Sequence, residues 1–160
     1  MKMMVKLQIL LVICMSISCS RLSPKIEIVE IKNKQLNIIE KGVTVNKIRE
    51  GYWITISDKN IIVIESYYIK GKQNGPIKMY YDDGKLMSLS YMQDGKENGI
   101  RISYYYNGII RDIGMIRNDE NEGNWTFYSK KGKVDKIIFY KNGVGVLIKD
   151  NHLSVPVPGM

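Results

Sequence analysis

Apolar and aromatic positions gather in short segments through the middle of the chain, and polar stretches that contain glycine separate them. Each segment has the length of a β-strand. A first set of segments follows a glycine, and a second set follows another turn about half a repeat later. The first set covers residues 52–57, 76–81, 100–106 and 124–129, and the second covers 62–68, 86–92, 110–116 and 134–140. The pattern predicts four successive β-hairpins.

The hairpins recur every 24 residues, and eight positions mark the period. They are Gly51, Gly75, Gly99 and Gly123 at one turn, and Asn60, Gly84, Gly108 and Gly132 at the other. Asparagine tolerates positive φ best after glycine, so the second turn suits left-handed backbone in every copy. Polar stretches over 70–75, 93–99 and 118–123 are expected to be connecting loops. We therefore predict an all-β fold, an antiparallel meander of tandem 24-residue β-hairpins forming one elongated, twisted sheet.

Composition and the flanking segments agree with a sheet protein. The chain contains no alanine, the best helix former, and many β-branched residues. The repeats are expected to occupy 51–143. Before them, the strand-like runs of 26–48, broken at Asn33 and Gly42, are expected to cap the first hairpin. After them, 144–160 is expected to be an extended tail, because Pro156 and Pro158 lack the amide that a central strand requires.

The first eighteen residues have the features of an export signal. Lys2 and Lys6 form a basic start, and residues 7–17 form an apolar run too short for a membrane-spanning helix. The stretch "SISC" ends at Cys19 and resembles the lipobox of bacterial lipoproteins, which implies cleavage before Cys19 and lipidation of its sulfur. Residues 19–50 would then hold the anchor, a tether and the capping strands. Ordinary cleavage after Ser20, which would release a soluble secreted protein, is the alternative.

The chain lacks the residues that several kinds of catalytic or metal-binding site require. Removal of the signal leaves Cys19 as the one cysteine, so an internal disulfide, a thiolate metal cluster and a cysteine nucleophile are all excluded. The single histidine, His152, has no serine or cysteine motif beside it. We therefore expect no catalytic residues, no metal and no cofactor. The formal charge of +8 suits anionic lipids, acidic glycans or an acidic protein, whereas nucleic acid is not expected outside the cell.

The repeat resembles a known family. Glycine, an aliphatic or aromatic position, tyrosine, a second glycine and a closing aliphatic residue form a pattern similar to the MORN repeat variant, which also occurs in YwqK-type antitoxins. Three units carry it, beginning at Gly75, Gly99 and Gly123, whereas the first unit has Ile56 in place of tyrosine and Asn60 in place of glycine. The resemblance implies a hairpin scaffold for protein or membrane contact, without catalytic residues.

The tyrosines of the repeat admit two interpretations. In the first they are structural and pack against cross-strand neighbours such as Tyr91, Met115 and Phe139. In the second they form an exposed ladder that binds a glycan or an extended peptide. The candidate binding surface consists of Tyr80, Tyr81, Tyr104, Tyr105, Trp125 and Tyr128.

The predicted function is a non-enzymatic scaffold, anchored by lipid in the bacterial cell envelope, that binds a partner protein. One alternative is a module for an envelope glycan or a lipid headgroup. The other is an antitoxin or immunity protein that neutralises a partner toxin.

Overall fold

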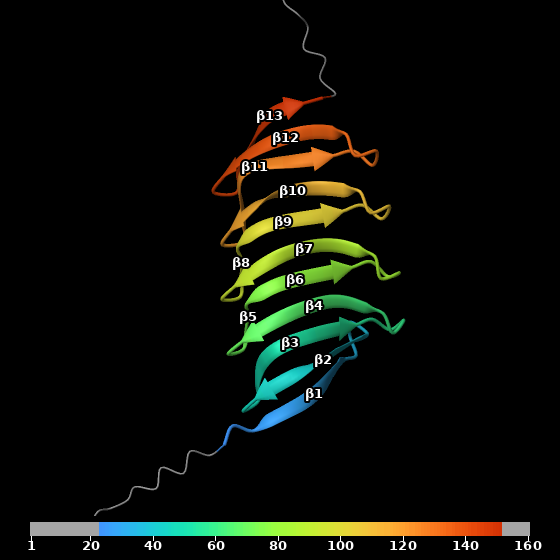
Figure 1. Cartoon of the computed structure of the whole chain (residues 1–160), viewed down its shortest axis with the longest axis vertical. Coiled ribbons are helices and arrows are strands. Elements are labelled where there is room, and N and C mark those ends of the chain that lie inside the picture. Colours follow the sequence, from blue (N-terminus) through green and yellow to red (C-terminus); the bar gives the residue numbers. More distant parts are fainter. Residues whose placement is uncertain (1–22, 152–160) are drawn as a thin grey trace, which may run out of the picture.

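The computed structural model describes residues 23–151, and within that range the chain forms a single antiparallel sheet and no helix. Eleven strands follow one another in chain order from one end of the sheet to the other, while β5 and β8 lie off this path and pair with β4 and β7 (Figure 1). The strands are β1 (Ile26–Asn33), β2 (Ile38–Val45), β3 (Ile48–Ile56), β4 (Ile62–Ile69), β5 (Lys72–Gln73), β6 (Gly75–Tyr80), β7 (Leu86–Gln93), β8 (Lys96–Glu97), β9 (Gly99–Tyr104), β10 (Ile110–Arg117), β11 (Glu120–Tyr128), β12 (Val134–Lys141) and β13 (Val144–Asp150). The all-β meander predicted from the sequence is confirmed.

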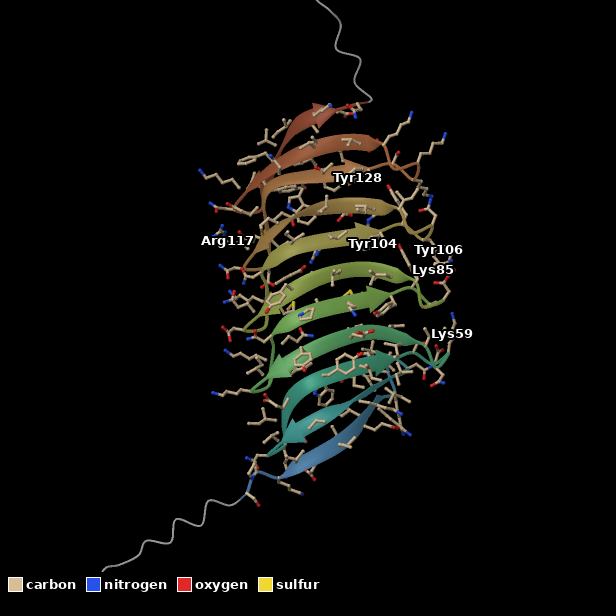
Figure 2. All side chains as sticks on the ribbon, in the orientation of Figure 1. Lys59, Lys85, Tyr104, Tyr106, Arg117 and Tyr128 are labelled. Carbon is tan, nitrogen blue, oxygen red and sulfur yellow. The ribbon has the colours of Figure 1, made fainter. Side chains whose placement is uncertain are left out.

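One rim of the sheet consists of two-residue turns, and we call it the Arg117 rim after the residue labelled there (Figure 2). The turns lie at 46–47, 70–71, 94–95, 118–119 and 142–143, and all ten residues have φ between 49° and 84°. Positive φ at both positions is the type I′ geometry, whose twist matches that of the flanking strands. The loops predicted over 70–75, 93–99 and 118–123 are therefore tight turns, because pairing resumes directly after each one.

The opposite rim carries Lys59, Lys85 and Tyr106 (Figure 2), and we call it the Tyr106 rim. Its turns place one residue at positive φ: Asn60 at 59°, Gly84 at 83°, Gly108 at 81° and Gly132 at 77°. In each turn the amide of that residue donates to the carbonyl three residues earlier, at 2.8–3.0 Å. This is a type I turn closed by a glycine bulge. The positive φ predicted for the second turn is confirmed in all four copies.

The other four marker glycines lie in strands rather than in turns. Gly75 and Gly99 begin β6 and β9 with φ of 114° and 120°, and Gly51 and Gly123 lie inside β3 and β11 with φ of 69° and 67°. The pairing register shifts beside Gly51 and Gly123. Positive φ in a strand marks a bulge, which bends the strand and increases its twist.

Each repeat is attached to the next at both rims. At the Arg117 rim the second residue of a turn donates its amide to a carbonyl 22 residues earlier, as Gly95 does to Gln73 at 2.8 Å. At the Tyr106 rim the Tyr81 hydroxyl donates to the Tyr104 carbonyl at 2.7 Å, and Tyr105 donates to Tyr128 at 2.8 Å. Contacts of this kind join nearest neighbours, which is the organisation of a repeat protein.

The two flanks of the repeats differ in detail from the expectation. Gly42 was expected to break a strand, but it lies inside β2, where the Trp53 ring covers it. The tail was expected from residue 144, but residues 144–150 form β13 and pair with β12. Both prolines lie beyond 151, so nothing in residues 144–150 prevents pairing. β1 and β13 are the two edges of the sheet (Figure 1).

Candidate binding surface

The two faces of the sheet differ in how they are packed. Side chains of directly paired residues lie on the same face, so the strand register assigns each residue to a face. One face, which we call the packed face, holds every fully buried side chain among the described residues: Thr44, Trp53, Thr55, Ser66, Ile77, Ser103, Asp112, Ile116 and Trp125. The other, which we call the open face, holds none of them.

The packed face is organised around two tryptophans at equivalent positions. The ring of Trp53 lies over Gly42 and donates from Nε1 to the Val43 carbonyl at 3.2 Å. The ring of Trp125 lies over Gly114 in the same way, and its Nε1 donates to Met115 at 2.9 Å. A single sheet without a second layer gains most of its apolar burial from such side chains lying flat on neighbouring strands.

The open face presents a line of exposed apolar side chains along the length of the sheet. Strand pairing places Tyr52 beside Tyr67, Pro76 beside Tyr91, and Ile100 beside Met115, on β3, β4, β6, β7, β9 and β10. Phe139 on β12 extends the line beyond Asn124 of β11. We call this line the apolar row, and it consists of Tyr52, Tyr67, Pro76, Tyr91, Ile100, Met115 and Phe139. Apart from Pro76, which is also exposed, these side chains are 41–56% exposed. A contiguous apolar surface of this kind usually marks an interaction site.

Four charged groups on the open face form two ion pairs. Lys41 Nζ lies 3.0 Å from a Glu30 oxygen, and Lys78 Nζ lies 3.3 Å from a Glu65 oxygen. Cross-strand partners Leu89 and Ile102 lie next to the second pair on the same face. The apolar row is therefore flanked by neutralised ion pairs and aliphatic side chains, which favours an apolar partner surface over a charged one.

Glu65 is the polar centre of the open face. Its carboxylate accepts a hydrogen bond from the Tyr80 hydroxyl at 2.6 Å, which lowers the pKa of Glu65. Burial, together with this bond, raises the pKa of Tyr80 to about 12. Burial and Glu65 also raise the pKa of Tyr52. At neutral pH the cluster therefore consists of an ionised carboxylate held by neutral tyrosine hydroxyls.

The tyrosines that were predicted from the sequence to form a binding surface lie in different environments. Tyr80, Tyr104 and Tyr128 lie half-buried on the open face; Tyr104 and Tyr128 lie at equivalent places in successive repeats (Figure 2). Their cross-strand partners are Leu86, Ile110 and Val134. Tyr91, Met115 and Phe139, which were expected to be those partners, lie instead in the apolar row, because the glycine bulge sets a different register.

Three other candidates contribute to the fold. Tyr81 and Tyr105 use their hydroxyls to attach one repeat to the next. Trp125 is 3% exposed on the packed face, so it offers almost no surface for a ligand. The exposed surface is thus the apolar row beside the predicted tyrosines, and it contains none of the six predicted residues.

Sequence reasoning did not select the apolar row as a surface. A signal was available, because Tyr67, Tyr91, Met115 and Phe139 are themselves spaced by 24 residues. Periodicity alone does not tell which of two recurring apolar positions is covered, since both faces of a one-layer sheet contact solvent.

Neither a metal centre nor a membrane-spanning helix is found in the part of the chain that the structure describes. Residues 23–151 contain no group of three or more His, Cys, Asp or Glu side chains arranged to hold a metal. Within the same range no helix has the length and apolar character needed to cross a bilayer. Cys19 and His152 lie outside the described residues.

Comparison with known families identifies part of the repeat. The profile of the MORN repeat variant matches residues 73–94 and 121–142. Each match starts just after a turn of the Arg117 rim and ends at the next one, so it covers one complete hairpin. The unit that begins at Gly99 lies between the matches and is not matched, although the sequence predicted it would be. No curated protein matches the chain.

Proposed function

We propose that this protein is a non-enzymatic scaffold of the bacterial cell envelope that binds a partner protein through its open face. The observation that carries the proposal is the apolar row, because it leaves six large side chains 41–56% exposed along one face. Burial of such a side chain from full exposure contributes roughly 1.5–3 kcal/mol, so covering the exposed half contributes about half of that. A partner that covers even part of the row would gain enough to bind specifically.

The geometry of the row suits a protein better than a small ligand. Neighbouring strands lie about 4.8 Å apart, so a row that crosses from β3 to β12 spans roughly 34 Å. Standard protein interfaces bury about 800 Å² on each partner, which a surface of this length can supply. The ion pairs beside the row are neutralised internally, so the contact would be mainly apolar at its centre.

The decisive comparison uses two variants that make the same chemical change at different places. Ile100→Lys puts a charge into the row, where Ile100 is 56% exposed, and Leu36→Lys does so in the turn between β1 and β2, where Leu36 is 64% exposed. Each tagged protein is purified from its own membranes after mild crosslinking, and the co-purifying proteins are identified by mass spectrometry. A protein recovered in near-equal amount with wild type and Leu36→Lys but lost with Ile100→Lys is the expected result. Recovery of the same proteins with all three would overturn the proposal.

A second candidate function is binding of an envelope glycan or a lipid headgroup. Tyr52, Tyr67 and Tyr91 favour it, because three half-exposed rings lie in one row and the rings of Tyr52 and Tyr67 are 6.4 Å apart. Aromatic rings of this kind can stack on sugars. The protein should then sediment with purified cell wall or with vesicles of anionic lipid. Loss of this sedimentation when Tyr67 and Tyr91 are replaced by serine would support the function.

A toxin partner would be a special case of the protein-binding function, and the crosslinking experiment would identify it.

Membrane attachment through Cys19 is part of the proposal, and it is supported by the resemblance of "SISC" to a lipobox. Replacement of Cys19 by serine should move the protein from the detergent phase to the aqueous phase in phase separation. A Cys19→Ser protein that stays in the detergent phase would show that something other than this lipid holds it there.

A further inference from the structure

The packed face contains a hollow of about 530 Å³ between its two tryptophans. Near both ends of the sheet the equivalent space is filled, because Trp53 and Trp125 lie over glycines. In the two units between them Ile77 and Arg101 occupy the tryptophan position, and Ser90 lies between them on β7. Neither Ile77 nor Arg101 has a flat ring that covers the neighbouring strand, so the centre of the face stays uncovered. A hollow of this size is in the range of small-molecule sites.

Two arginines border the hollow, and a carboxylate holds each of them. Arg101 Nε donates to Glu97 at 2.7 Å, and its Nη2 pairs with the second Glu97 oxygen. Arg111 Nε donates to Asp112 at 2.8 Å. Asp112 also accepts a 2.8 Å hydrogen bond from Ser103, and these two side chains are only 7% and 3% exposed. The buried pair therefore fixes the direction of the Arg111 guanidinium.

The ion pairs with Glu97 and Asp112 leave other N–H groups of the two arginines without a hydrogen-bond acceptor. Both terminal nitrogens of Arg111, and Nη1 of Arg101, have no acceptor among residues 23–151. The hydroxyls of Ser88 and Ser90, on the wall of the hollow, also bind no described residue. Guanidinium forks and hydroxyls are the groups that proteins use to bind carboxylate and phosphate oxygens.

The remaining wall is apolar and adaptable. It is formed by Ile77 and by three methionines, Met79, Met87 and Met92. Methionine side chains change shape readily and suit alkyl groups of different lengths. We propose that the hollow binds an amphiphilic anion, with its carboxylate or phosphate group on Arg101 and Arg111 and its alkyl chain against the methionines. This site lies on the face opposite the apolar row and does not depend on the scaffold function.

The position of these residues in the repeat supports a role beyond folding. Equivalent cross-strand pairs are Met79 with Ser88, Ser103 with Asp112, and Phe127 with Lys136. A buried carboxylate occurs in the middle pair alone, where it carries a desolvation cost that its hydrogen bonds offset. This unit supplies both arginines, and it is the unit between the two MORN matches that the profile does not match. The departure from the repeat thus coincides with the hollow.

The experiment titrates the purified protein with acetate, octanoate and octyl phosphate while the methionine methyl signals are followed by NMR. Octanoate should bind at least about tenfold more tightly than acetate, because burial of two or more CH₂ groups contributes about that factor. The largest shifts are expected at Met79 and Met92. Comparison of octanoate with octyl phosphate identifies the head group, since the tighter of the two shows whether carboxylate or phosphate is preferred.

Three variants separate this site from non-specific attraction. Arg101→Gln should weaken octanoate binding at least about fivefold, whereas Arg117→Gln, the same change at the end of β10 on the open face, should leave it unaltered (Figure 2). Ser90→Leu fills the hollow with all charges retained, so it should abolish binding while circular dichroism stays unchanged. Equal affinity for acetate and octanoate, an equal effect of the two arginine variants, unimpaired binding by Ser90→Leu, or shifts confined to Met115 on the open face would each overturn the proposal.

Discussion

Replacement of Gly114 by alanine should destabilise the protein although alanine is otherwise the better strand residue. An added Cβ would lie 2.2 Å from Cδ2 and 2.3 Å from Cε2 of Trp125, far inside van der Waals contact. The ring is 3% exposed and its Nε1 is bonded to the Met115 carbonyl at 2.9 Å, so it cannot move aside freely. Overpacking costs about 1–3 kcal/mol, and loss of a tryptophan's packing costs about 3–5 kcal/mol. We expect a loss of about 3 kcal/mol.

A double-mutant cycle isolates this contact. Gly114→Ala, Trp125→Ala and the double variant are unfolded in guanidinium chloride and followed by far-UV circular dichroism. Without the ring, Gly114→Ala should be neutral or stabilising by about 0.5 kcal/mol, because alanine restricts the unfolded chain. The coupling energy should therefore be about 3 kcal/mol. Gly42 provides a second copy, since a Cβ there would lie 2.2 Å from Trp53.

Gly95 is the matched control for backbone strain. Its φ is +84°, and a Cβ there would meet nothing within 4 Å. Gly95→Ala should therefore cost about 1–2 kcal/mol and show no coupling to Trp125. If Gly114→Ala costs the same amount with and without the Trp125 ring, the proposed packing of tryptophan over glycine does not stabilise the packed face.

The remaining predictions concern the hydroxyls of the repeat tyrosines. Tyr105→Phe should lower the free energy of unfolding by about 1 kcal/mol, because the Tyr128 carbonyl loses its hydrogen-bond donor. Guanidinium denaturation measures this loss. An unchanged midpoint would show that this hydroxyl does not join the repeats. Tyr80 should ionise near pH 12 by absorbance at 295 nm, and Glu65→Gln should shift that titration downward. The raised pKa means that the stabilisation from Tyr80 is complete below pH 10 and is lost as the pH rises through 12. The pKa of Glu65 is lowered, so its contribution to folding stability depends on pH in the opposite direction: it is present above pH 4.5 and is lost on further acidification. Glu65→Gln should therefore make the stability of the protein less sensitive to acid.

The period of the sequence predicted the strands of the repeats closely. The second arms were expected at 62–68, 86–92, 110–116 and 134–140, and each observed strand is one residue longer. Success here has a physical cause: glycine or asparagine at positive φ is a local requirement, and it recurs wherever the turn recurs. The Arg117 rim was harder to predict, because Lys47 and Lys70 also take positive φ, which lysine does not indicate.

The candidate site was less accessible to sequence reasoning because it depends on register. Trp125 was chosen as an aromatic residue of the repeat, yet the register places it on the packed face, whereas Phe139 is placed on the open face. The hollow was not anticipated at all. It results from Ile77 and Arg101 in place of tryptophan, and their vicinity follows from the pairing of β6, β7 and β9 rather than from any local motif.

The two faces of the sheet place different demands on the sequence of the repeat. Tryptophans over glycines and hydroxyl bonds between repeats stabilise the sheet without contacts from the apolar row, so substitutions in that row should cost little folding free energy. The packed face has less freedom, because Trp53 and Trp125 fill it near both ends. Only the two central units, where tryptophan is replaced, could accept polar groups there. A site for a second ligand would therefore be expected at the centre of the packed face, which is where Arg101, Arg111 and the methionines lie.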